Sequence, residues 1–311
     1  MERIVIVIVG PTCSGKSDVA FNLALKLNTE IISADSRQIY KQLNIGTAKP
    51  SSDKLQKIKH HFINELNIDE KFDASKFEVK GLKIIDEMFN KNKVPIVAGG
   101  TGLYIKALID GITSSIPNDI NFRDDLLKRR REFGNEYLYN ELKKIDPISA
   151  DKMLPQNWKR VIRALEVFHL TGKSIIKIQK EVNRESEIKF IQFGLKWNRD
   201  LLYQRINERV EKMINLGLVN EVKEILSQGY DKNLYSLNTV GYKEIIDYLE
   251  NKHSLEKAID LIKRNTRRYA KKQFTWFNKD KRIFWFDIKS EEELLDNTNK
   301  IIANCQLKIA N

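Results

Sequence analysis

The sequence has few cysteines and no long apolar stretch, and both absences limit what the protein can be. Its two cysteines, Cys13 and Cys305, lie near opposite ends of 311 residues, too few for a disulfide framework or a zinc finger. The apolar run at 4–9 is much too short to cross a membrane and lacks the cleavage site of a signal peptide. We therefore expect a protein of a reducing compartment, the cytoplasm, with no place in a membrane.

Acidic residues are also in the minority. The 54 Lys and Arg residues exceed the 42 Asp and Glu residues, which gives a net charge of +12. Such an excess favours anionic partners such as nucleic acid or phosphorylated metabolites, although a general bias toward lysine would produce the same number. A composition of 41% hydrophobic and 31% charged residues indicates a folded chain rather than a disordered one.

Strand and helix patterns alternate in the first hundred residues. Strands are predicted at 4–9, 30–34 and 94–98, and helices at 16–27 and 77–90. The first strand is an unbroken β-branched run, as expected for a parallel strand covered on both faces. This alternation predicts an α/β fold with a parallel sheet flanked by helices, of the P-loop NTPase type.

The later sequence predicts an insertion into this fold. Charged helical patterns at 122–144 and 157–171 interrupt the alternation, and strand patterns return at 189–195 and 282–286. We therefore predict a P-loop core with C-terminal helices, formed by residues 1–118 and 189–311, and an all-helical insertion at 119–188.

The segment GPTCSGKS at 10–17 matches the phosphate-binding pattern G-x-x-x-x-G-K-[ST] and stands between a predicted strand and a predicted helix. Its glycines let backbone N–H groups converge on phosphate oxygens at the positive end of the helix. Lys16 supplies a charge to the terminal phosphates, and Ser17 can bind Mg²⁺. The predicted phosphate site comprises Gly10, Thr12, Cys13, Ser14, Gly15, Lys16 and Ser17.

Two polar residues follow the next strands, at the sheet edge where such folds bind ligands. Asp35, after the strand at 30–34, is suited to act as a general base or to hold Mg²⁺ through water, or simply to cap a helix. Thr101, after the strand at 94–98, can donate to a leaving phosphate oxygen or cap the helix that follows. No acidic residue ends that strand, which counts against an ATPase.

Three segments together resemble one family: GPTCSGKS at 10–17, DSRQIY at 35–40 and GGTGLY at 99–104. They are similar to segments of the bacterial tRNA dimethylallyltransferases, also called isopentenyl-diphosphate:tRNA transferases. Four further segments agree, in the same order along the chain: GTAKP at 46–50, RVIRALE at 160–166, VGYKE at 240–244 and RYAKKQFTWF at 268–277.

The resemblance implies transfer of a dimethylallyl group from dimethylallyl diphosphate to N6 of the adenosine at position 37 of tRNA. Asp35 then accepts the proton, Thr101 contacts the bridging oxygen, and Lys16 with Mg²⁺ neutralises the departing diphosphate. The family also places a phosphate-contacting arginine at Arg205 or, less favoured, Arg209. Exposed ion pairing is the alternative for these arginines. No obligate protein partner is implied, and weak ATP binding is left open.

The family pattern also implies contacts with the tRNA anticodon stem-loop. The implied residues are Asp35, Ser36, Arg37, Gln38, Thr101, Arg123, Lys159, Arg160, Arg163, Gly241, Tyr242 and Lys243. Basic residues between 263 and 272 add cations for backbone phosphates. Lys159 departs from the glutamine more common in the family, and the sequence has no Cys/His-rich C-terminal segment of the eukaryotic kind.

Two other interpretations fit part of the sequence. A small-molecule kinase would use the P-loop and Asp35, with Arg129–Arg131 as a lid on ATP, but would leave the basic tail unused. A non-catalytic RNA-binding protein with a nucleotide switch would use the charge, but would leave Asp35 and Thr101 without a role.

Overall fold

The computed structural model describes residues 2–112, 116–181 and 187–305, and the chain divides into two compact units. The first unit combines residues 1–108 with 186–311, and the second comprises residues 109–185. We predicted the insertion at 119–188, so the second unit begins earlier than predicted. Residues 182–186 of that range, and the chain end from 306, lie outside the described residues.

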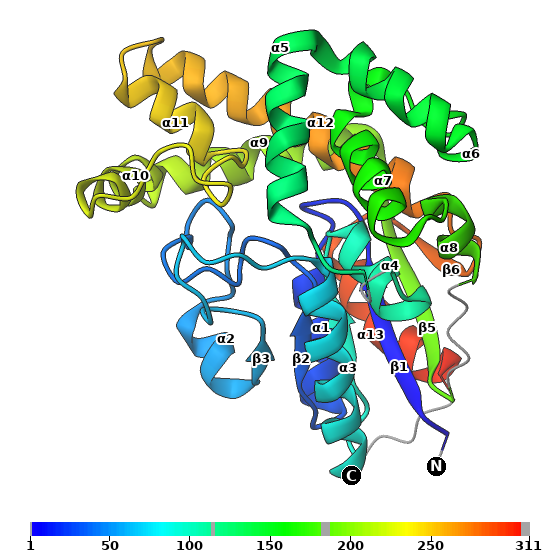
Figure 1. Ribbon diagram of the computed structural model, residues 1–311. Helices are drawn as coiled ribbons and strands as arrows, with labels where there is room; N and C mark the ends of the chain where they lie inside the picture. The colour runs from blue at the N-terminus through cyan, green and yellow to red at the C-terminus, as the bar shows by residue number, and fades with distance from the viewer. Residues whose placement is uncertain (1, 113–115, 182–186, 306–311) are drawn as a thin grey trace. The chain divides into compact units, whose positions relative to one another are not determined.

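The first unit is built on a six-stranded parallel sheet with the strand order β3-β2-β4-β1-β5-β6 (Figure 1). The strands are β1 (Ile4–Val9), β2 (Ile31–Ser33), β3 (His60–His61), β4 (Ile96–Ala98), β5 (Lys189–Trp197) and β6 (Ile283–Ile288). The six residues of β1 are all buried, as its β-branched sequence predicts. The predicted parallel α/β class is confirmed. Only β3 was missed, because two histidines carry no strand pattern.

Helices flank this sheet, and α9 to α12 lie between β5 and β6 in the sequence. They are α1 (Lys16–Lys26), α2 (Ser52–Lys57), α3 (Ala74–Asn90), α4 (Gly102–Asp110), α9 (Arg199–Asn215), α10 (Leu218–Ser227), α11 (Tyr242–Leu249), α12 (Leu255–Phe277) and α13 (Glu291–Asn304). Helix α1 packs against β1, β2 and β4, with α13 beside it (Figure 1). The buried side chains of Ile6, Leu23 and Leu294 belong to the core that joins these elements. That core fixes the start of α1 above the sheet edge.

The second unit is helical and has a core of its own. It contains α5 (Ile120–Ile145), α6 (Pro147–Ala150), the 3-10 turn Pro155–Asn157, α7 (Trp158–Thr171) and α8 (Ile175–Glu181). Helix α5 is kinked at Gly134, whose φ of 86° interrupts the helix. Leu142 and Leu165 are among the buried side chains of the core. Helix α7 ends at Gly172, which is in the left-handed conformation that favours glycine.

None of the helices in the described parts of the chain combines the length and the apolar character that crossing a membrane requires.

Candidate active site

The phosphate loop adopts a strained but well-supported backbone. Cys13 and Gly15 both have positive φ angles, 65° and 85°. A side chain at Gly15 would also collide with Leu294 of α13, since a Cβ there would lie 2.3 Å from its Cδ2. The indole N–H of Trp197 donates to the Ser14 carbonyl oxygen at 3.0 Å. Side chains from β5 and α13 therefore contact the loop and support it. The positive φ angle and this contact require glycine at position 15.

Lys16 begins α1 and is folded back onto the loop. Its ammonium group donates to the carbonyl oxygen of Pro11 at 2.6 Å. Burial lowers the pKa of Lys16 to about 8, while the nearby charges of Cys13 and Asp35 act to raise it and that of Arg209 to lower it. A buried ammonium group with a lowered pKa in a polar cleft is typical of a site for an anionic ligand. Binding of the anion would raise the pKa of Lys16 again.

Asp35 and Thr101 are joined through the short segment after β2. Asp35 Oδ1 accepts hydrogen bonds from the backbone N–H groups of Arg37 and Gln38, at 2.8 and 3.3 Å. Thr101 Oγ1 accepts from the backbone N–H of Ser36 at 3.1 Å. The helix-capping role considered for Asp35 is absent, since the next helix, α2, begins only at Ser52, and these bonds hold a turn instead. They use one carboxylate oxygen, and the side chain also lines the cleft. The hydroxyl proton of Thr101 is left for another acceptor.

Gln273 of α12 connects the phosphate loop and the loop after β4, a role that was not predicted. Its Oε1 accepts from the backbone N–H of Thr12 at 2.8 Å, and its Nε2 donates to the carbonyl oxygen of Gly100 at 2.9 Å. A Cβ at Gly100 would lie 2.2 Å from that Nε2, so only glycine permits the contact. Because Gln273 is 261 positions from Thr12 along the chain, only the fold could reveal the bridge.

Arg205 and Arg209 of α9 both reach the phosphate loop, in different ways. Arg205 Nε donates to the carbonyl oxygen of Cys13 at 2.9 Å, its guanidinium lies 4.2 Å from the centre of the Trp197 ring, and Glu291 of α13 pairs with it. Among the described residues, Arg209 makes only long contacts, 3.9 Å to Cys13 Sγ and 3.4 Å to the carbonyl oxygen of Thr47. Arg205 is therefore already fixed and paired, whereas Arg209 is the more weakly engaged of the two.

Gln38 holds a loop rather than presenting a free amide. Its Nε2 donates to the carbonyl oxygens of Thr47 and Ala48, at 3.2 and 3.3 Å, and its Oε1 accepts from the Ser33 hydroxyl at 3.3 Å. Both amide protons are used. The tRNA contact predicted for Gln38 would require these bonds to be exchanged if it used the side-chain amide.

The Tyr242 side chain is part of the core. It is fully buried, its hydroxyl donates to Glu221 Oε1 at 2.5 Å, and its ring fills the space beside Gly46. Glu221 also accepts from the backbone N–H groups of Asn44 and Ile45. A fully buried ring cannot touch RNA, so the predicted tRNA contact is wrong for this side chain. Its neighbour Gly241 is buried too, while Lys243 is exposed.

These loops enclose one cleft of about 980 Å³ in the first unit. Its walls include Thr12, Cys13, Gly15, Lys16, Ser17, Asp35, Gln38, Gly99, Gly100, Arg205, Arg209, Tyr269 and Gln273. The structure thus brings together most of the residues that the sequence placed in the phosphate and catalytic site. A phosphate-binding loop, a carboxylate and an aromatic ring on one wall are suited to a reaction between an organic phosphate and a planar base.

The described residues include no group of three or more His, Cys, Asp or Glu side chains that could hold a metal ion by themselves. Mg²⁺ prefers oxygen ligands and is commonly bound through few protein groups together with substrate phosphates and water. Ser17, at the start of α1, and Asp35 line the same cleft and offer such oxygens. The residues present therefore fit a Mg²⁺ ion that arrives with a diphosphate.

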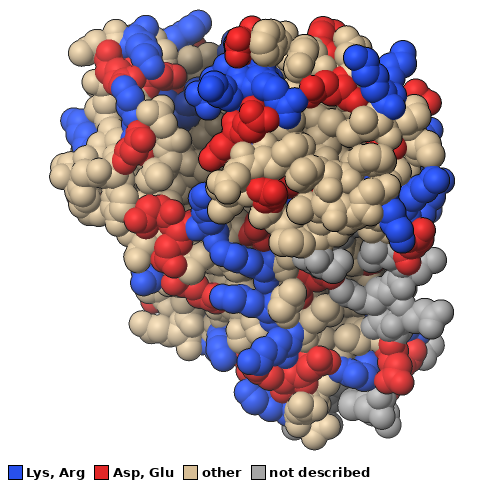
Figure 2. All heavy atoms as spheres, in the orientation of Figure 1, with Lys and Arg blue, Asp and Glu red and all other residues tan. Residues whose placement is uncertain are grey.

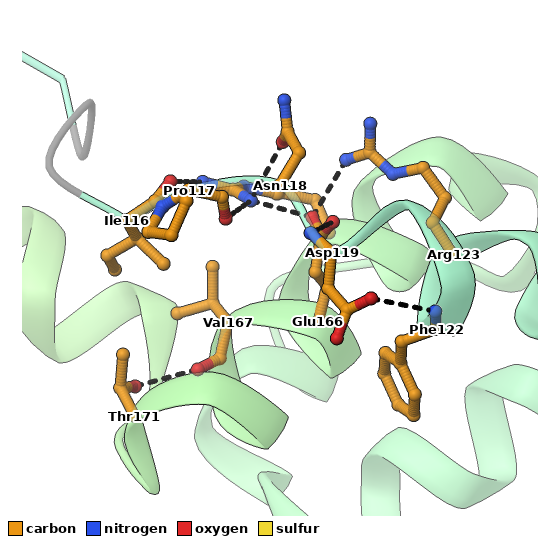
Figure 3. Close-up of polar contacts among 10 residues, drawn as sticks. Ile116, Pro117, Asn118, Asp119, Phe122, Arg123, Glu166, Val167 and Thr171 are labelled. Carbon is orange, nitrogen blue, oxygen red and sulfur yellow. Dashed lines mark hydrogen bonds and ion pairs between the residues drawn. The ribbon is translucent and has the colours of Figure 1, made fainter.

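In the second unit, Arg123 and Arg163 surround the buried carboxylate of Glu166. Arg123 and Glu166 are labelled in Figure 3. The Glu166 side chain is fully buried and its Oε2 accepts from Arg123 at 2.8 Å and from Arg163 at 2.6 Å. Arg163 also donates to the Ile116 carbonyl oxygen at 2.9 Å, which ties the segment before α5 to α7. This bond is one physical reason why the unit begins before residue 119. Both arginines have internal partners, which the prediction of tRNA contacts did not foresee.

The other basic residues of α7 and α5 differ in exposure. Lys159 and Arg160 are exposed. Arg129 pairs with Asp125 and Glu141, each at 2.8 Å, and Arg130 lies 3.9 Å over the Trp158 ring. Two of the three arginines that the kinase interpretation assigned to an ATP lid, Arg129 and Arg130, are therefore engaged in contacts within the unit itself.

Helix α12 carries an exposed basic face. Arg264, Arg268, Lys271 and Lys272 are exposed and lie at helical spacing, whereas Lys263 pairs with Glu211 and Arg267 donates to Asn207. On the face drawn in Figure 2, Lys and Arg side chains are interspersed with Asp and Glu. Net charge alone therefore does not locate an RNA surface, and the exposed face of α12 is the better candidate.

Comparison with known proteins gives one consistent result. The family model described as IPP transferase matches residues 38–280. The tRNA dimethylallyltransferase of Acetivibrio thermocellus is 46% identical over 309 residues, 98% of this chain and 97% of that protein, and that of Alkaliphilus oremlandii is 47% identical over 99% and 97%. Both alignments include the phosphate loop, which precedes the segment matched by the family model.

Solved structures agree. The tRNA isopentenylpyrophosphate transferase of Bacillus halodurans superposes with a TM-score of 0.72 at 36% identity, covering 98% of this chain and 97% of that one. A eukaryotic dimethylallyltransferase acting on tRNA has a TM-score of 0.84 at 28% identity and covers 99% of this chain and 81% of that one.

Proposed function

The chain belongs to the IPP transferase family, and we propose that it transfers the dimethylallyl group of dimethylallyl diphosphate to N6 of adenosine 37 in tRNA, releasing diphosphate. The observation that carries this proposal is the single cleft lined by the phosphate loop and Asp35, with Thr101 bonded to the segment after Asp35. Relatives that match almost the whole chain are tRNA dimethylallyltransferases.

The residues divide the chemistry between them. The adenine N6 attacks the allylic carbon, a carbon–nitrogen bond forms, and the carbon–oxygen bond breaks with its electron pair going to the diphosphate. Asp35 takes the proton from N6, and Thr101, whose oxygen already accepts from Ser36, donates its hydroxyl proton to the leaving oxygen. Lys16 and Arg205, with Arg209 as the alternative, balance the charge of the departing diphosphate.

We propose Mg²⁺ as the cofactor, held by the Ser17 hydroxyl and by oxygens of the diphosphate. When bound, it would supply positive charge to the leaving group. The protein's own part is to orient the diphosphate with the backbone N–H groups of the loop and to hold the Lys16 ammonium against it.

The proposed tRNA surface comprises exposed cations and the cleft rim. Lys159, Arg160 and Lys243 are exposed, as is the basic face of α12. Tyr269 of α12 lines the cleft and is 44% exposed, so it is placed to stack on an extruded adenine. We further propose that the protein is a cytoplasmic monomer.

The direct test is incubation of the purified protein with Mg²⁺, dimethylallyl diphosphate and unmodified tRNA, followed by mass spectrometry of the digested nucleosides. We expect an adenosine heavier by one dimethylallyl group at position 37. Absence of that product, together with turnover of ATP on a small hydroxylated acceptor, would replace the proposal by the kinase interpretation.

A further inference from the structure

Two of the sequence segments noted above, GTAKP at 46–50 and VGYKE at 240–244, take no part in the proposed chemistry, yet they touch each other. A Cβ at Gly46 would lie 2.3 Å from Cε2 of Tyr242, so the buried ring packs directly on the backbone of Gly46. The start of α11 holds that ring in place, because Glu244 Oε2 accepts from the backbone N–H of Gly241 at 2.8 Å. The contact between the two segments is therefore fixed from the α11 side.

The carboxylate of Glu221, on α10, bonds to both sides of this contact. Its Oε2 accepts from the backbone N–H groups of Asn44 and Ile45, at 3.1 and 2.8 Å. Its Oε1 accepts from the backbone N–H of Gly46 at 3.3 Å and from the hydroxyl of Tyr242 at 2.5 Å. Three consecutive N–H groups thus converge on one charged acceptor, which is the stronger kind of hydrogen bond.

The hydroxyl of Tyr242 remains a donor over the physiological pH range. Burial raises the pKa of this phenol, and the negative charge of Glu221 raises it further. The four donors of the Glu221 carboxylate are therefore all neutral groups that keep their protons. Together they define the path of the chain at 44–48, which we call the tethered loop.

The tethered loop is part of the cleft wall, through Asn44, Ile45, Thr47 and Ala48. Its Thr47 carbonyl oxygen accepts from Gln38 Nε2 at 3.2 Å and from Arg209 Nη2 at 3.4 Å. Gln38 in turn donates its backbone N–H to Asp35 Oδ1 at 3.3 Å. One carbonyl of the tethered loop is therefore shared by an arginine at the phosphate loop and by the residue that bonds to Asp35.

Arg209 depends on this carbonyl because it has few other restraints. Among the described residues, its hydrogen-bond contacts are the Thr47 carbonyl oxygen and Cys13 Sγ. Arg205 is held differently, by the Cys13 carbonyl oxygen and by Glu291, which lie outside the tethered loop. A shift of the tethered loop would therefore move an acceptor of Arg209 and leave the partners of Arg205 where they are.

We propose that Glu221 is a positioning residue of the diphosphate site. By holding the tethered loop, it places the Thr47 carbonyl and, through that carbonyl, the guanidinium of Arg209. The inference rests on the proposed function and takes Arg209 as a group that contacts the diphosphate. Glu221 itself does not touch the substrate.

The test is a double-mutant cycle on the affinity for inorganic diphosphate, measured by calorimetric titration with Mg²⁺, and it needs no turnover. Glu221→Ala should weaken binding by about tenfold. Added to Arg209→Met, it should weaken binding by less than about a further twofold, because the guanidinium that it positions is gone. Added to Arg205→Met, it should retain its full effect, because the partners of Arg205 do not belong to the tethered loop.

Three further variants serve as controls. Glu224→Ala removes the same charge from an exposed position of α10 and should bind diphosphate like the wild type. Glu221→Gln should recover most of the affinity, since its amide oxygen can still accept from the N–H groups of Asn44 and Ile45. Tyr242→Phe removes only one of the four bonds and should show the same coupling to Arg209 at a smaller size, which keeps the cycle measurable if Glu221→Ala does not fold.

Two results would overturn the inference and leave the proposed function standing. One is an equal loss of affinity in the Arg209→Met and Arg205→Met backgrounds, which would show that Glu221 only stabilises the fold. The other is wild-type affinity in Glu221→Ala. Absence of diphosphate binding by the wild-type protein, together with absence of transfer to tRNA, would remove the proposed function and this inference together.

Discussion

Arginines gather in two regions of this molecule, and their partners differ. At the phosphate loop, Arg205 is paired with Glu291, whereas Arg209 makes only long contacts with described residues and Lys16, whose pKa is lowered, donates to a backbone carbonyl. In the second unit, Arg123 and Arg163 converge on the buried Glu166, and Arg163 has carbonyl partners as well. Arg209 and Lys16 can therefore still pair with a bound anion, whereas Arg123 and Arg163 are already paired within the protein.

The difference shows that partners, more than the number of charges, separate a binding site from a structural cluster. A buried carboxylate that already accepts from two guanidinium groups leaves little for a phosphate to gain. A cation whose burial is only partly compensated gains most when an anion arrives. The predictions below compare satisfied and unsatisfied groups, from the largest expected effect to the smallest.

The largest effect is expected for Asp35→Asn. Asparagine retains a side-chain oxygen that can accept from the N–H groups of Arg37 and Gln38, but it cannot act as a base. Turnover should fall by about 10²–10⁴-fold, the usual contribution of a general base, while tRNA affinity and melting temperature stay unchanged. Single-turnover transfer measures the turnover, a tRNA-binding assay measures the affinity, and thermal unfolding measures the melting temperature. Wild-type turnover in Asp35→Asn, with a loss of stability only in Asp35→Ala, would show that Asp35 serves only to hold the turn.

Next in size is the contrast between two arginines of α7. Arg163→Met should destabilise the second unit by about 2–3 kcal/mol, less than the roughly 3–5 kcal/mol of a fully broken buried pair because Arg123 still faces Glu166. Arg160→Met, on the same helix at an exposed position, should leave stability unchanged and weaken tRNA binding. Thermal unfolding, with proteolysis mapped to residues 109–185, is the measurement. Equal stability of the two variants would contradict the assignment of Arg163 to structure.

The sequence predicted the sheet, the phosphate loop and the two polar strand ends, because each of these follows from a local pattern. The β-branched run of β1 requires burial on both faces, and the glycines of the loop are defined by a short motif. The strand ends then place Asp35 and Thr101 at one edge of a parallel sheet without further information.

Contacts between distant segments could not be predicted in this way. Gln273 bridges Thr12 and Gly100 from a helix near the other end of the chain. It lies in the family segment at 268–277, but that segment does not indicate which loops it contacts. Glu166 is a different case. It follows Arg163 by three residues, a spacing that places the two on one helix face, so an internal ion pair was readable from the sequence. The tRNA contact of the Tyr242 side chain was wrongly predicted because a sequence motif does not show which of its side chains are buried.

Gln273→Leu tests whether the bridge between the loops matters for catalysis. Leucine removes both hydrogen bonds and leaves the N–H of Thr12 and the carbonyl of Gly100 without this partner. We expect kcat to fall by about 10–100-fold, equivalent to the roughly 1–3 kcal/mol of unsatisfied buried groups. Thr275→Ala, on an exposed position two residues along α12, is the control. An unchanged kcat in Gln273→Leu would mean that the loops hold their geometry without the bridge.

The lowered pKa of Lys16 predicts a pH dependence of diphosphate binding. The group is charged below pH 8 and loses its proton as the pH rises through about 8, so affinity for inorganic diphosphate should be level below pH 8 and decline above it. A decline of up to about tenfold per pH unit corresponds to one proton. Calorimetric titration between pH 6.5 and 9.5 measures it.

Lys49, whose pKa burial also lowers to about 8, provides the comparison for Lys16. Its ammonium group already donates to the carbonyl oxygens of Tyr40 and Lys41 and to Asn44. Lys49→Met should therefore retain the decline above pH 8, and Lys16→Met should lose it. The reverse result would transfer the role to Lys49.

The smallest expected effect is on the salt dependence of tRNA binding, and it distinguishes two neighbouring arginines of α12, one with a partner in the protein and one exposed. Arg267 donates to Asn207 at 2.7 Å, whereas Arg268 is exposed. If Arg268 meets a tRNA phosphate, Arg268→Met removes one released counterion, and the slope of log affinity against log salt becomes shallower by roughly 0.7–0.9. Arg267→Met should leave the slope unchanged, because its charge is directed into the protein. Equal slopes for both variants and the wild type would mean that this face of α12 does not meet the RNA backbone, and the exposed cations Lys159 and Arg160 of α7 would then have to carry the salt dependence.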